Sequence, residues 1–273
     1  MIRRTIMLNE KSLDGICAAL ADTMGIERPE HAAEPNEVLK KYVEDKLGTK
    51  KADRIFMYNP DAIAEWIYEK YEKLVKELGR HTEVAVPLCS VMPSVTPVCF
   101  GTMYTGAQPA VHGIRKYDKP VISIDSIFDS LIRAGKKVAI VAEKNCSMSM
   151  IYLNRDMDYF IYNSIEEVNA KASELIIEDK YDFLAVYNGN YDSIMHKYGP
   201  ESIEALSELR ANVEAFATFS ELIKNRWGMH DTLVGFAMDH GCHEIDGGCG
   251  SHGLDMDEDL NIVHLYRVYP KND

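Results

Sequence analysis

Aspartate and histidine side chains are grouped at two places in the second half of the chain. Asp192 and His196 lie four positions apart, a spacing at which one helical turn directs both side chains to the same point. Asp239 and His240 are adjacent, and His252 follows within the glycine-rich stretch GGCGSHG. Carboxylate oxygens and imidazole nitrogens are ligands of Zn²⁺ and related divalent ions. These two groupings predict metal-dependent chemistry.

The Asp239-His240 pair ends an apolar run, residues 232–238, that is expected to be buried in a sheet. A buried carboxylate without a cation or several hydrogen-bond donors is strongly destabilising, so a metal ion explains the pair better than an unpaired charge does. The glycine-rich loop allows His252 to reach the same strand end. A separate structural zinc site is a second interpretation that stays open at this point. Its ligands would be Cys242, His243, Cys249 and His252.

Thr96 and Asp61 each precede a predicted helix. Thr96 is expected to be the N-cap of one helix and Pro97 its first residue. The positive end of that helix would attract a phosphate or sulfate to the Thr96 hydroxyl. Asp61 follows the apolar run 55–58 and is expected to begin the helix through Trp66. For both residues, ordinary capping without chemistry is the alternative interpretation.

Short apolar runs alternate with amphipathic segments from Arg54 onward, which is typical of a largely parallel sheet covered by helices. The predicted strands are 55–58, 83–88, 121–124, 137–141, 159–162, 183–187 and 232–238. The predicted helices include 126–134, 165–177, 203–225 and one that passes through Trp66 and ends near Gly79. The carboxyl ends of parallel strands meet at one edge of a sheet, so the residues after these strands should converge there.

The first fifty residues carry two apolar patterns at helical spacing, one on each side of Pro35. We interpret residues 1–50 as an N-terminal helical appendage. Residues 51–273 are then the catalytic domain, of the α/β class.

Taken in chain order, several segments resemble the alkaline phosphatase superfamily, and within it the type I phosphodiesterase/nucleotide pyrophosphatase branch. The segment 93–114, PSVTPVCFGTMYTGAQPAVHGI, resembles the nucleophile segment of that branch, with a threonine nine residues before Thr-Gly. The segments 192–200 (DSIMHKYGP), 239–241 (DHG) and 251–253 (SHG) resemble its metal-binding motifs. The resemblance implies a three-layer α/β/α sandwich with a largely parallel central sheet, alkaline phosphatase-like and lacking a large cap insertion.

The resemblance also implies a site with two divalent metal ions, by default Zn²⁺, with Mn²⁺ or Fe as alternatives. One ion would be held by Asp192, His196 and His252. The other would be held by Asp61, Asp239, His240 and the Thr96 oxygen. Thr96 would attack the phosphorus atom of a phosphate ester and form a covalent phosphothreonine that is then hydrolysed.

Three departures from the family pattern bear on substrate binding. An asparagine of the family, three residues after the threonine, is matched by Cys99, a weak hydrogen-bond donor, which makes Cys99 a candidate substrate contact. Arg115, which directly follows the HGI motif at 112–114, is the other candidate substrate contact. Ala62 stands where the family has glycine. Only eleven residues separate His240 from His252, where relatives commonly insert a substrate-covering cap. The site is expected to be open, or to be covered by the N-terminal helices or a partner subunit.

The expected function is hydrolysis of phosphate esters of the phosphodiester or nucleotide pyrophosphate type. Two alternatives stay open. One is a phosphonate or phosphomonoester hydrolase on the same site. The other is a catalytically degenerate metal-binding protein.

The composition restricts the partners. Thirty Lys+Arg and 43 Asp+Glu in 273 residues give a formal net charge of −13, which argues against binding to nucleic-acid polymers or anionic membranes. The expected partner is a small phosphate-containing substrate, and homo-oligomer formation is left open. Six scattered cysteines, and no apolar segment after the N-terminal basic residues, predict a cytoplasmic protein with reduced thiols.

Overall fold

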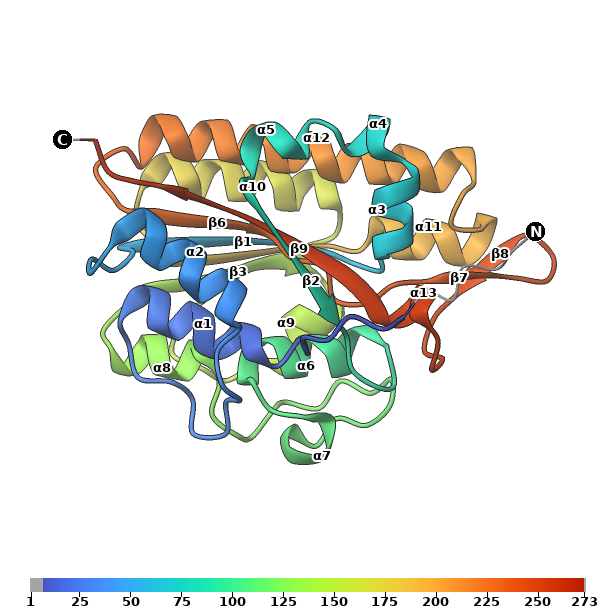
Figure 1. The fold of residues 1–273 in the computed structure, drawn as a ribbon, viewed down its shortest axis with the longest axis horizontal. Coiled ribbons are helices and arrows are strands. Elements are labelled where there is room, and N and C mark those ends of the chain that lie inside the picture. The colour runs from blue at the N-terminus through green and yellow to red at the C-terminus, as the bar shows by residue number, and fades with distance from the viewer. Residues whose placement is uncertain (1–6, 273) are drawn as a thin grey trace.

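The computed structural model describes residues 7–272 and contains a seven-stranded central sheet (Figure 1). Its strands are β1 (Arg54–Pro60), β2 (Val84–Cys89), β3 (Val138–Glu143), β4 (Asp158–Tyr162), β5 (Phe183–Asn188), β6 (Thr232–Phe236) and β9 (Asn261–Tyr269). The spatial order is β2-β9-β6-β1-β5-β3-β4. All neighbours from β6 to β4 are parallel, whereas β9 is antiparallel to both β2 and β6. A separate hairpin consists of β7 (His243–Ile245) and β8 (Cys249–Ser251).

The centre of the sheet is apolar on both faces. Strand β1 lies between β5 and β6, and its Tyr58 is in register with Val186 on one side and Phe236 on the other. Every residue of these three strands is buried. Parallel strands covered on both faces have near-continuous apolar runs, which is why the sequence marked them clearly.

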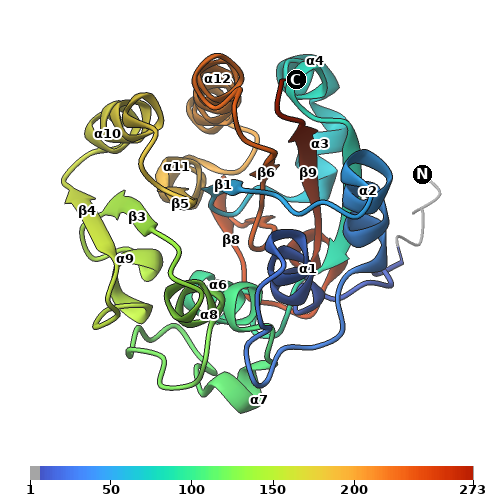
Figure 2. The same ribbon diagram turned by 90° about the vertical axis from the view of Figure 1, so that its left-hand side faces the viewer.

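Helices cover both faces of the sheet (Figures 1 and 2). They are α1 (Gly15–Met24), α2 (Glu37–Leu47), α3 (Glu65–Lys70), α4 (Glu72–Val75), α5 (Leu78–His81), α6 (Thr96–Thr105), α7 (Pro109–His112), α8 (Ile127–Arg133), α9 (Ser147–Ile151), α10 (Ile165–Glu178), α11 (Asn190–Tyr198), α12 (Ile203–Arg226) and α13 (Asp257–Leu260). One face carries α10 and α12, with α4 and α5 against α12. The other carries α1, α6, α8 and α9. The mixed α/β architecture predicted from the sequence is confirmed. Among residues 7–272, no helix combines the length and the apolar character needed to cross a membrane.

Serine caps fix the starts of three helices that the sequence predicts to within one residue. Ser164 accepts a hydrogen bond from Glu167 N at the start of α10, and Ser202 accepts one from Ala205 N at the start of α12. At the start of α8, Ser126 forms a reciprocal capping box with Asp129. These contacts satisfy backbone N–H groups that the first helical turn leaves free.

The strand predicted at 121–124 is wrong. Its backbone groups have partners outside the sheet. Ile122 N donates to Ile151 O at 2.8 Å, and the Arg155 guanidinium donates to the carbonyls of Ile122 and Ile124 at 3.2 and 3.5 Å. A β-branched run therefore forms an irregular loop, because a buried arginine takes the place of a neighbouring strand.

The helix predicted through Trp66 to Gly79 is three short helices rather than one. The first break falls at Tyr71, which has φ −104° and ψ 37° and separates α3 from α4. The Tyr71 hydroxyl donates to Glu201 at 2.6 Å, a contact that the sequence pattern did not reveal.

The two N-terminal helices share the hydrophobic core of the sheet. Helix α1 packs against α6 and α8, and nine of its ten residues are buried. Helix α2 packs on the edge formed by β2 and β9. The boundary at residue 50 between an appendage and a catalytic domain stays a prediction.

Candidate active site

Four segments bring the predicted ligands and Thr96 to one edge of the sheet. Strand β1 ends next to Asp61, β5 leads into α11 with Asp192, and β6 is followed by Asp239. Strand β2 runs in the same direction as β6, because both are antiparallel to β9, and it is followed by α6, which begins at Thr96. The carboxyl ends of the strands therefore assemble the site, as in other open α/β sheets.

Helix capping accounts for neither Thr96 nor Asp61. Helix α6 has Val95 as its N-cap, so Thr96 is its first residue rather than its cap. Helix α3 is capped by Ala64, so Asp61 does not begin it, contrary to the sequence prediction. Both side chains are buried, with 3% of Thr96 and 1% of Asp61 exposed. The backbone turn between Asp61 and Ala64 instead directs the carboxylate inward.

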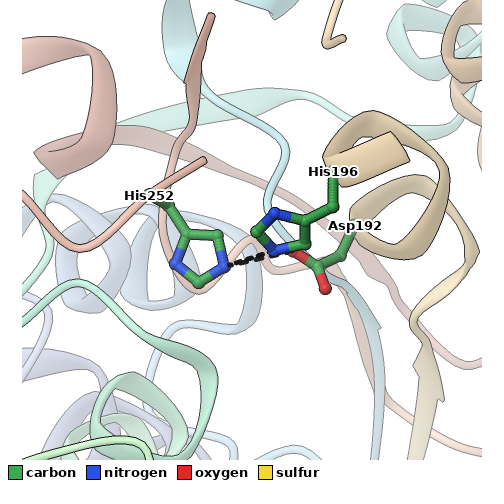
Figure 3. Close-up of side chains that lie close together, drawn as sticks. All are labelled: Asp192, His196 and His252. Atoms are coloured by element: carbon green, nitrogen blue, oxygen red, sulfur yellow. Dashed lines mark hydrogen bonds and ion pairs between the residues drawn. The ribbon is translucent and has the colours of Figure 1, made fainter. Parts of the chain in front are cut away.

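The first cluster consists of Asp192, His196 and His252 (Figure 3). Asp192 and His196 come from one side of α11, and His252 follows β8. Asp192 Oδ1 lies 3.2 Å from His196 Nε2 and 3.3 Å from His252 Nε2, and the two Nε2 atoms are 3.0 Å apart. Three ligand atoms thus face a common point.

Backbone carbonyls fix the tautomers of both histidines. His196 Nδ1 lies 3.0 Å from Gly250 O, and His252 Nδ1 lies 2.9 Å from Ser94 O. A carbonyl oxygen can only accept, so each Nδ1 carries the hydrogen, and Nε2 of the neutral ring presents a lone pair. Two lone pairs and a carboxylate oxygen repel one another unless a proton or a cation lies among them. Carbonyls that orient imidazole rings in this way are typical of metal sites.

The second cluster consists of Asp61, Asp239 and His240, all fully or almost fully buried. His240 Nε2 lies 3.4 Å from Asp61 Oδ1 and 3.3 Å from Asp239 Oδ2. His240 Nδ1 lies 2.9 Å from Gly241 O, so its Nε2 also presents a lone pair. Thr96 Oγ1 lies 3.3 Å from both Asp61 Oδ1 and His240 Nε2.

The two clusters adjoin each other. The ring centroids of His240 and His252, one from each cluster, are 4.2 Å apart. A substrate group bound at one cluster would therefore also be close to the other. Two cations held side by side would suit a group with several negatively charged oxygens, such as a phosphoryl group.

The carboxyl groups of the site have strongly altered acidities. Burial raises the pKa of Asp239 to about 7. Burial, together with the charges of Asp239 and Asp192, raises the pKa of Asp61 well above its ordinary value. Burial also tends to raise the pKa of Asp192. Contacts with the His196 and His252 rings have a larger and opposite effect, so the pKa of Asp192 is below its ordinary value. Without a cation, the second cluster therefore favours protonated carboxyl groups.

The donor atoms present fit divalent metal ions. Asp192 Oδ1 and Asp239 Oδ2 are buried and have no hydrogen-bond donor. In each cluster the ligand atoms lie within 4.8 Å of one another. A mixture of carboxylate oxygen and imidazole nitrogen is a common ligand set for Zn²⁺ and other divalent ions. A cation in each cluster would interact with the orphaned carboxylate oxygen and with the Nε2 lone pairs of the histidines in that cluster.

Two contacts that support the second cluster were missed by sequence reasoning. The Tyr187 hydroxyl donates to Asp61 Oδ2, which leaves Oδ1 facing Thr96. Ala62 N donates to Asp239 Oδ1 at 3.1 Å. The only sequence signal for Tyr187 is its place at the end of β5, a strand that leads to the site.

Ala62 makes its contact from an unusual backbone conformation. Its φ is 61°, in the left-handed region where a Cβ atom is unfavourable and glycine is not. This conformation accounts for the glycine that the family pattern has at this position. The alanine retains the turn that places its N–H group against Asp239.

Cys99 and Arg115 have hydrogen-bond partners outside the two clusters. Cys99 is fully buried, and its thiol accepts a hydrogen bond from Ser90 Oγ at 3.2 Å. Arg115 is exposed and donates to Ala110 O at 3.1 Å. Their roles in substrate binding stay predictions.

The four residues of the alternative zinc site do not come together. Their side chains have separate partners: the Cys242 thiol lies 3.9 Å from Tyr191 OH, the Cys249 thiol 3.5 Å from Lys197 O, and His243 Nδ1 2.7 Å from Asp259 Oδ1. Within residues 7–272, the two clusters are the only groups of three or more acidic, histidine or cysteine residues arranged for a metal ion.

The fold is alkaline phosphatase-like, as in the solved structures described below. More narrowly, the chain belongs to the type I phosphodiesterase / nucleotide pyrophosphatase family, whose sequence model matches residues 123–270. This family is a class of metal-dependent phosphoesterases. The matched region contains all of the first cluster, whereas Asp61 and Thr96 precede it.

Solved structures share the fold. Murine ectonucleotide pyrophosphatase / phosphodiesterase 5 matches with a TM-score of 0.56 and 18% identity, over 71% of this chain and 58% of that chain. Phosphonoacetate hydrolase from Sinorhizobium meliloti 1021, in complex with phosphonoformate, matches with a TM-score of 0.55 and 19% identity, over 72% and 59%. An inactive threonine-to-alanine variant of the murine protein, in complex with AMP, matches with a TM-score of 0.52 and 17% identity, over 71% and 59%.

This chain therefore spans less than three fifths of the length of these proteins, 58% to 59%. No curated protein sequence matches it.

Proposed function

We propose that this chain hydrolyses phosphate esters of the phosphodiester or nucleotide pyrophosphate type, with Thr96 as the nucleophile and two divalent metal ions as cofactors. The observation that carries the proposal is the position of Thr96 Oγ1, 3.3 Å from both Asp61 Oδ1 and His240 Nε2. A buried hydroxyl among metal ligands is a group that can be activated for attack. The family match supports the class of reaction.

The first cluster would hold one metal ion, and the second cluster, together with the Thr96 oxygen, would hold the other. When bound, the ions would lower the pKa of the Thr96 hydroxyl and stabilise negative charge on the phosphoryl oxygens. Zn²⁺ is the ion proposed, and the same ligands accept Mn²⁺ or Fe. The summed charge of two divalent ions exceeds that of the three aspartates, so the local field favours an anionic substrate despite the net charge of −13.

In the proposed reaction, Thr96 Oγ1 forms a bond to phosphorus while the bond to the leaving-group oxygen breaks. The hydroxyl of Thr96 loses its proton in this step, and its hydrogen-bond acceptor in the structure is Asp61 Oδ1. Water then attacks the phosphothreonine, which releases the phosphoryl product and restores the hydroxyl. Thr96 opens the ten-residue helix α6, so the positive end of the helix dipole favours the negative phosphoryl group in both steps.

Replacing the nucleophile tests this proposal. Thr96→Ala is expected to lower kcat by about 10³-fold or more, because no other hydroxyl can form the covalent bond, while metal content stays close to the wild-type value. Metal analysis and assays with bis-p-nitrophenyl phosphate measure the two effects. The inactive threonine-to-alanine variant of the murine protein supports the expected direction. Full activity of Thr96→Ala would overturn the assignment.

A second candidate is a phosphonate or phosphomonoester hydrolase on the same site. The shared fold of phosphonoacetate hydrolase supports it. Assays of bis-p-nitrophenyl phosphate, p-nitrophenyl phosphate and phosphonoacetate, each with added Zn²⁺ or Mn²⁺, distinguish the candidates. Hydrolysis of none of them by a protein that binds stoichiometric metal would instead favour a degenerate metal-binding protein.

The remaining sequence expectations complete the proposal. Residues 51–273 would form the catalytic domain, with 1–50 as a helical appendage, and the enzyme would act in the cytoplasm. Its substrate would be small rather than a nucleic-acid polymer, because a chain with a net charge of −13 repels extended polyanions.

A further inference from the structure

An asparagine at the end of β5 contacts the chain beside both metal clusters. Asn188 is the last residue of β5, and 1% of it is exposed. Its backbone oxygen accepts a hydrogen bond from Asp61 N at 2.9 Å, and its side-chain oxygen, Oδ1, accepts one from Asn190 N at 3.0 Å. Asn190 is the first residue of α11, the helix that carries Asp192. Asn188 therefore connects the end of β1 to the start of α11.

The side chain of Asn188 takes the place of a cap at the start of α11. The N-cap residue of this helix is Gly189, which has no side chain to accept a hydrogen bond, and a first helical turn leaves backbone N–H groups without partners. Asparagine readily accepts a hydrogen bond from the backbone two residues further on, as Asn188 does from Asn190. Asp192 lies in this first turn and His196 one turn later, so the path of the turn determines where both ligands point.

A chain of buried hydrogen bonds leads from Asn188 to α12. Asn188 Nδ2 donates to the Tyr58 hydroxyl of β1 at 2.9 Å, and this hydroxyl donates to Asn212 Oδ1 of α12 at 2.9 Å. Asn212 Nδ2 donates to Glu208 O, also at 2.9 Å. Tyr58 and Asn212 are fully buried. Burial raises the pKa of Tyr58, so its hydroxyl keeps its hydrogen.

The two ends of this chain are backbone groups, and they allow one orientation of each side chain between them. Glu208 O can only accept, so Asn212 presents its oxygen to Tyr58. A hydroxyl has one hydrogen, and Tyr58 donates it to Asn212, so Tyr58 accepts from the amide nitrogen of Asn188. The oxygen of Asn188 then faces Asn190 N, which can only donate. Helix α12 and strand β1 thus orient the group that caps α11.

We propose that Asn188 is a positioning residue of the first metal cluster, and that Tyr58 and Asn212 act through it by holding its amide in the orientation that caps α11. The inference rests on the metal sites of the proposed function and adds to them three residues outside the two clusters.

The first cluster alone should depend on this chain of hydrogen bonds. Without the Tyr58 hydroxyl, Asn188 Nδ2 and Asn212 Oδ1 would be buried without partners, and the Asn188 amide would no longer be fixed. The hydrogen bond to Asp61 is made by the backbone oxygen of Asn188, so the second cluster does not depend on the orientation of the amide.

Proteins with a single complete cluster make the test specific. Asp239→Asn/His240→Ala leaves the first cluster complete, and His196→Ala/His252→Ala leaves the second. Zn²⁺ dissociation constants, measured by competition with a chromogenic chelator, then report on one cluster at a time. Tyr58→Phe is expected to weaken Zn²⁺ binding by the first cluster about 10- to 100-fold and to change binding by the second less than about twofold.

The matched control is Tyr104→Phe. Tyr104 is also fully buried, and its hydroxyl donates at 2.7 Å to the side-chain oxygen of another buried asparagine, Asn59 of β1. Asn59 Nδ2 donates to the carbonyls of Met57 and Val186, within the sheet. Both tyrosine variants are expected to lower the melting temperature, because each leaves a buried amide without a partner. Tyr104→Phe should leave the Zn²⁺ affinity of each cluster within about twofold of its parent value.

Two substitutions of Asn188 test this residue directly and do not depend on the folding of Tyr58→Phe. Asn188→Leu removes the acceptor and is expected to weaken Zn²⁺ binding by the first cluster about 10- to 100-fold. Asn188→Ser retains an oxygen that accepts from the N–H group two residues on, although more weakly than asparagine does. Its affinity should lie between those of the parent protein and of Asn188→Leu.

An unchanged affinity of the first cluster, in Asn188→Leu or in folded Tyr58→Phe, would overturn the inference. An affinity of Asn188→Ser no higher than that of Asn188→Leu would also overturn it. Equal losses at the two clusters, or an equal loss in Tyr104→Phe, would do the same, because they would indicate a general loosening of the fold. Failure of the proposed function appears separately, as a lack of ester hydrolysis by wild-type protein that binds zinc.

Discussion

Each histidine in the two clusters has its Nδ1 directed at a backbone carbonyl oxygen, as in His240 and Gly241. The two aspartates of the second cluster are held in a similar way. Asp61 receives the Tyr187 hydroxyl on one oxygen, and Asp239 receives the Ala62 N–H group. Each of these residues therefore presents one atom to the site while its other polar atom is fixed by the protein, which lowers the conformational entropy lost when an ion binds.

Tyr187 offers a test of this arrangement at the residue scale. Tyr187→Phe is expected to weaken metal binding by about 10- to 100-fold, because Asp61 Oδ2 would be left buried without its donor and the carboxylate could rotate. Competition with a chromogenic chelator measures the affinity. Tyr181→Phe is the matched control, since it removes a hydroxyl that bonds Asp158 instead. An unchanged affinity in Tyr187→Phe would contradict the positioning role.

At the scale of elements, the first cluster depends on the packing of the β7-β8 hairpin against α11. Gly250 of β8 provides the carbonyl that orients His196. It also lies so close to α11 that an added Cβ would be 2.6 Å from the backbone oxygen of Met195. The hairpin thus positions His196 by its carbonyl and His252 by its chain connection.

Gly250→Ala is expected to displace the hairpin from α11, because the new Cβ would meet the backbone oxygen of Met195, which cannot move aside as the Met195 side chain can. Metal content should fall toward that of the second cluster alone, and kcat/KM should fall by about tenfold or more as His252 moves away. Metal analysis and steady-state kinetics measure both effects. Gly79→Ala, where nothing lies within 4 Å of an added Cβ, is the control and should behave as wild type. Wild-type metal content in Gly250→Ala would rule out this role for the hairpin.

The elements also show what the sequence could predict. The central strands and the long helices were predicted well, because burial on both faces and amphipathic spacing are local patterns. Strand β9 was not predicted: His264 and Arg267 interrupt its apolar pattern, and its place between β2 and β6 depends on pairing with distant segments. The strand predicted at 121–124 was wrong because its partner is the Arg155 side chain.

For the candidate site, the sequence indicated which aspartates and histidines are candidate ligands and that they follow predicted strands. The structure brings those residues into two clusters. The contact of the Tyr187 hydroxyl with Asp61 could not be predicted. It depends on a side-chain direction that no local spacing encodes.

At the scale of the whole molecule, the unliganded site is a source of instability that depends on pH. The pKa of Asp239 is about 7 in the folded protein, above the roughly 3.9 of an unfolded chain. Between these values the folded state binds more protons than the unfolded state does, so this carboxyl group lowers the free energy of unfolding as pH rises.

In metal-free protein, the free energy of unfolding relative to that of Asp239→Asn is therefore expected to fall as pH rises from about 4 to about 7, by up to about 1.4 kcal/mol per pH unit. The comparison with Asp239→Asn removes the contributions of groups whose pKa does not depend on Asp239, such as His264, whose buried ring has a pKa of about 4 and acts in the opposite direction. Denaturant unfolding at several pH values measures the difference. Added Zn²⁺ should reverse the loss. A difference that grows with pH would contradict the linkage.

The ligands of the site are far apart along the chain. Ala62 and Asp239, which are hydrogen-bonded, are separated by 177 positions, and His196 and His252 by 56. During synthesis, the second cluster is incomplete until β6 and the residues after it have left the ribosome. A metal ion stabilises only the state that binds it, so it adds nothing to the nascent chain and acts on the completed fold. Metal supply would then determine how long the finished protein persists rather than whether its early elements form.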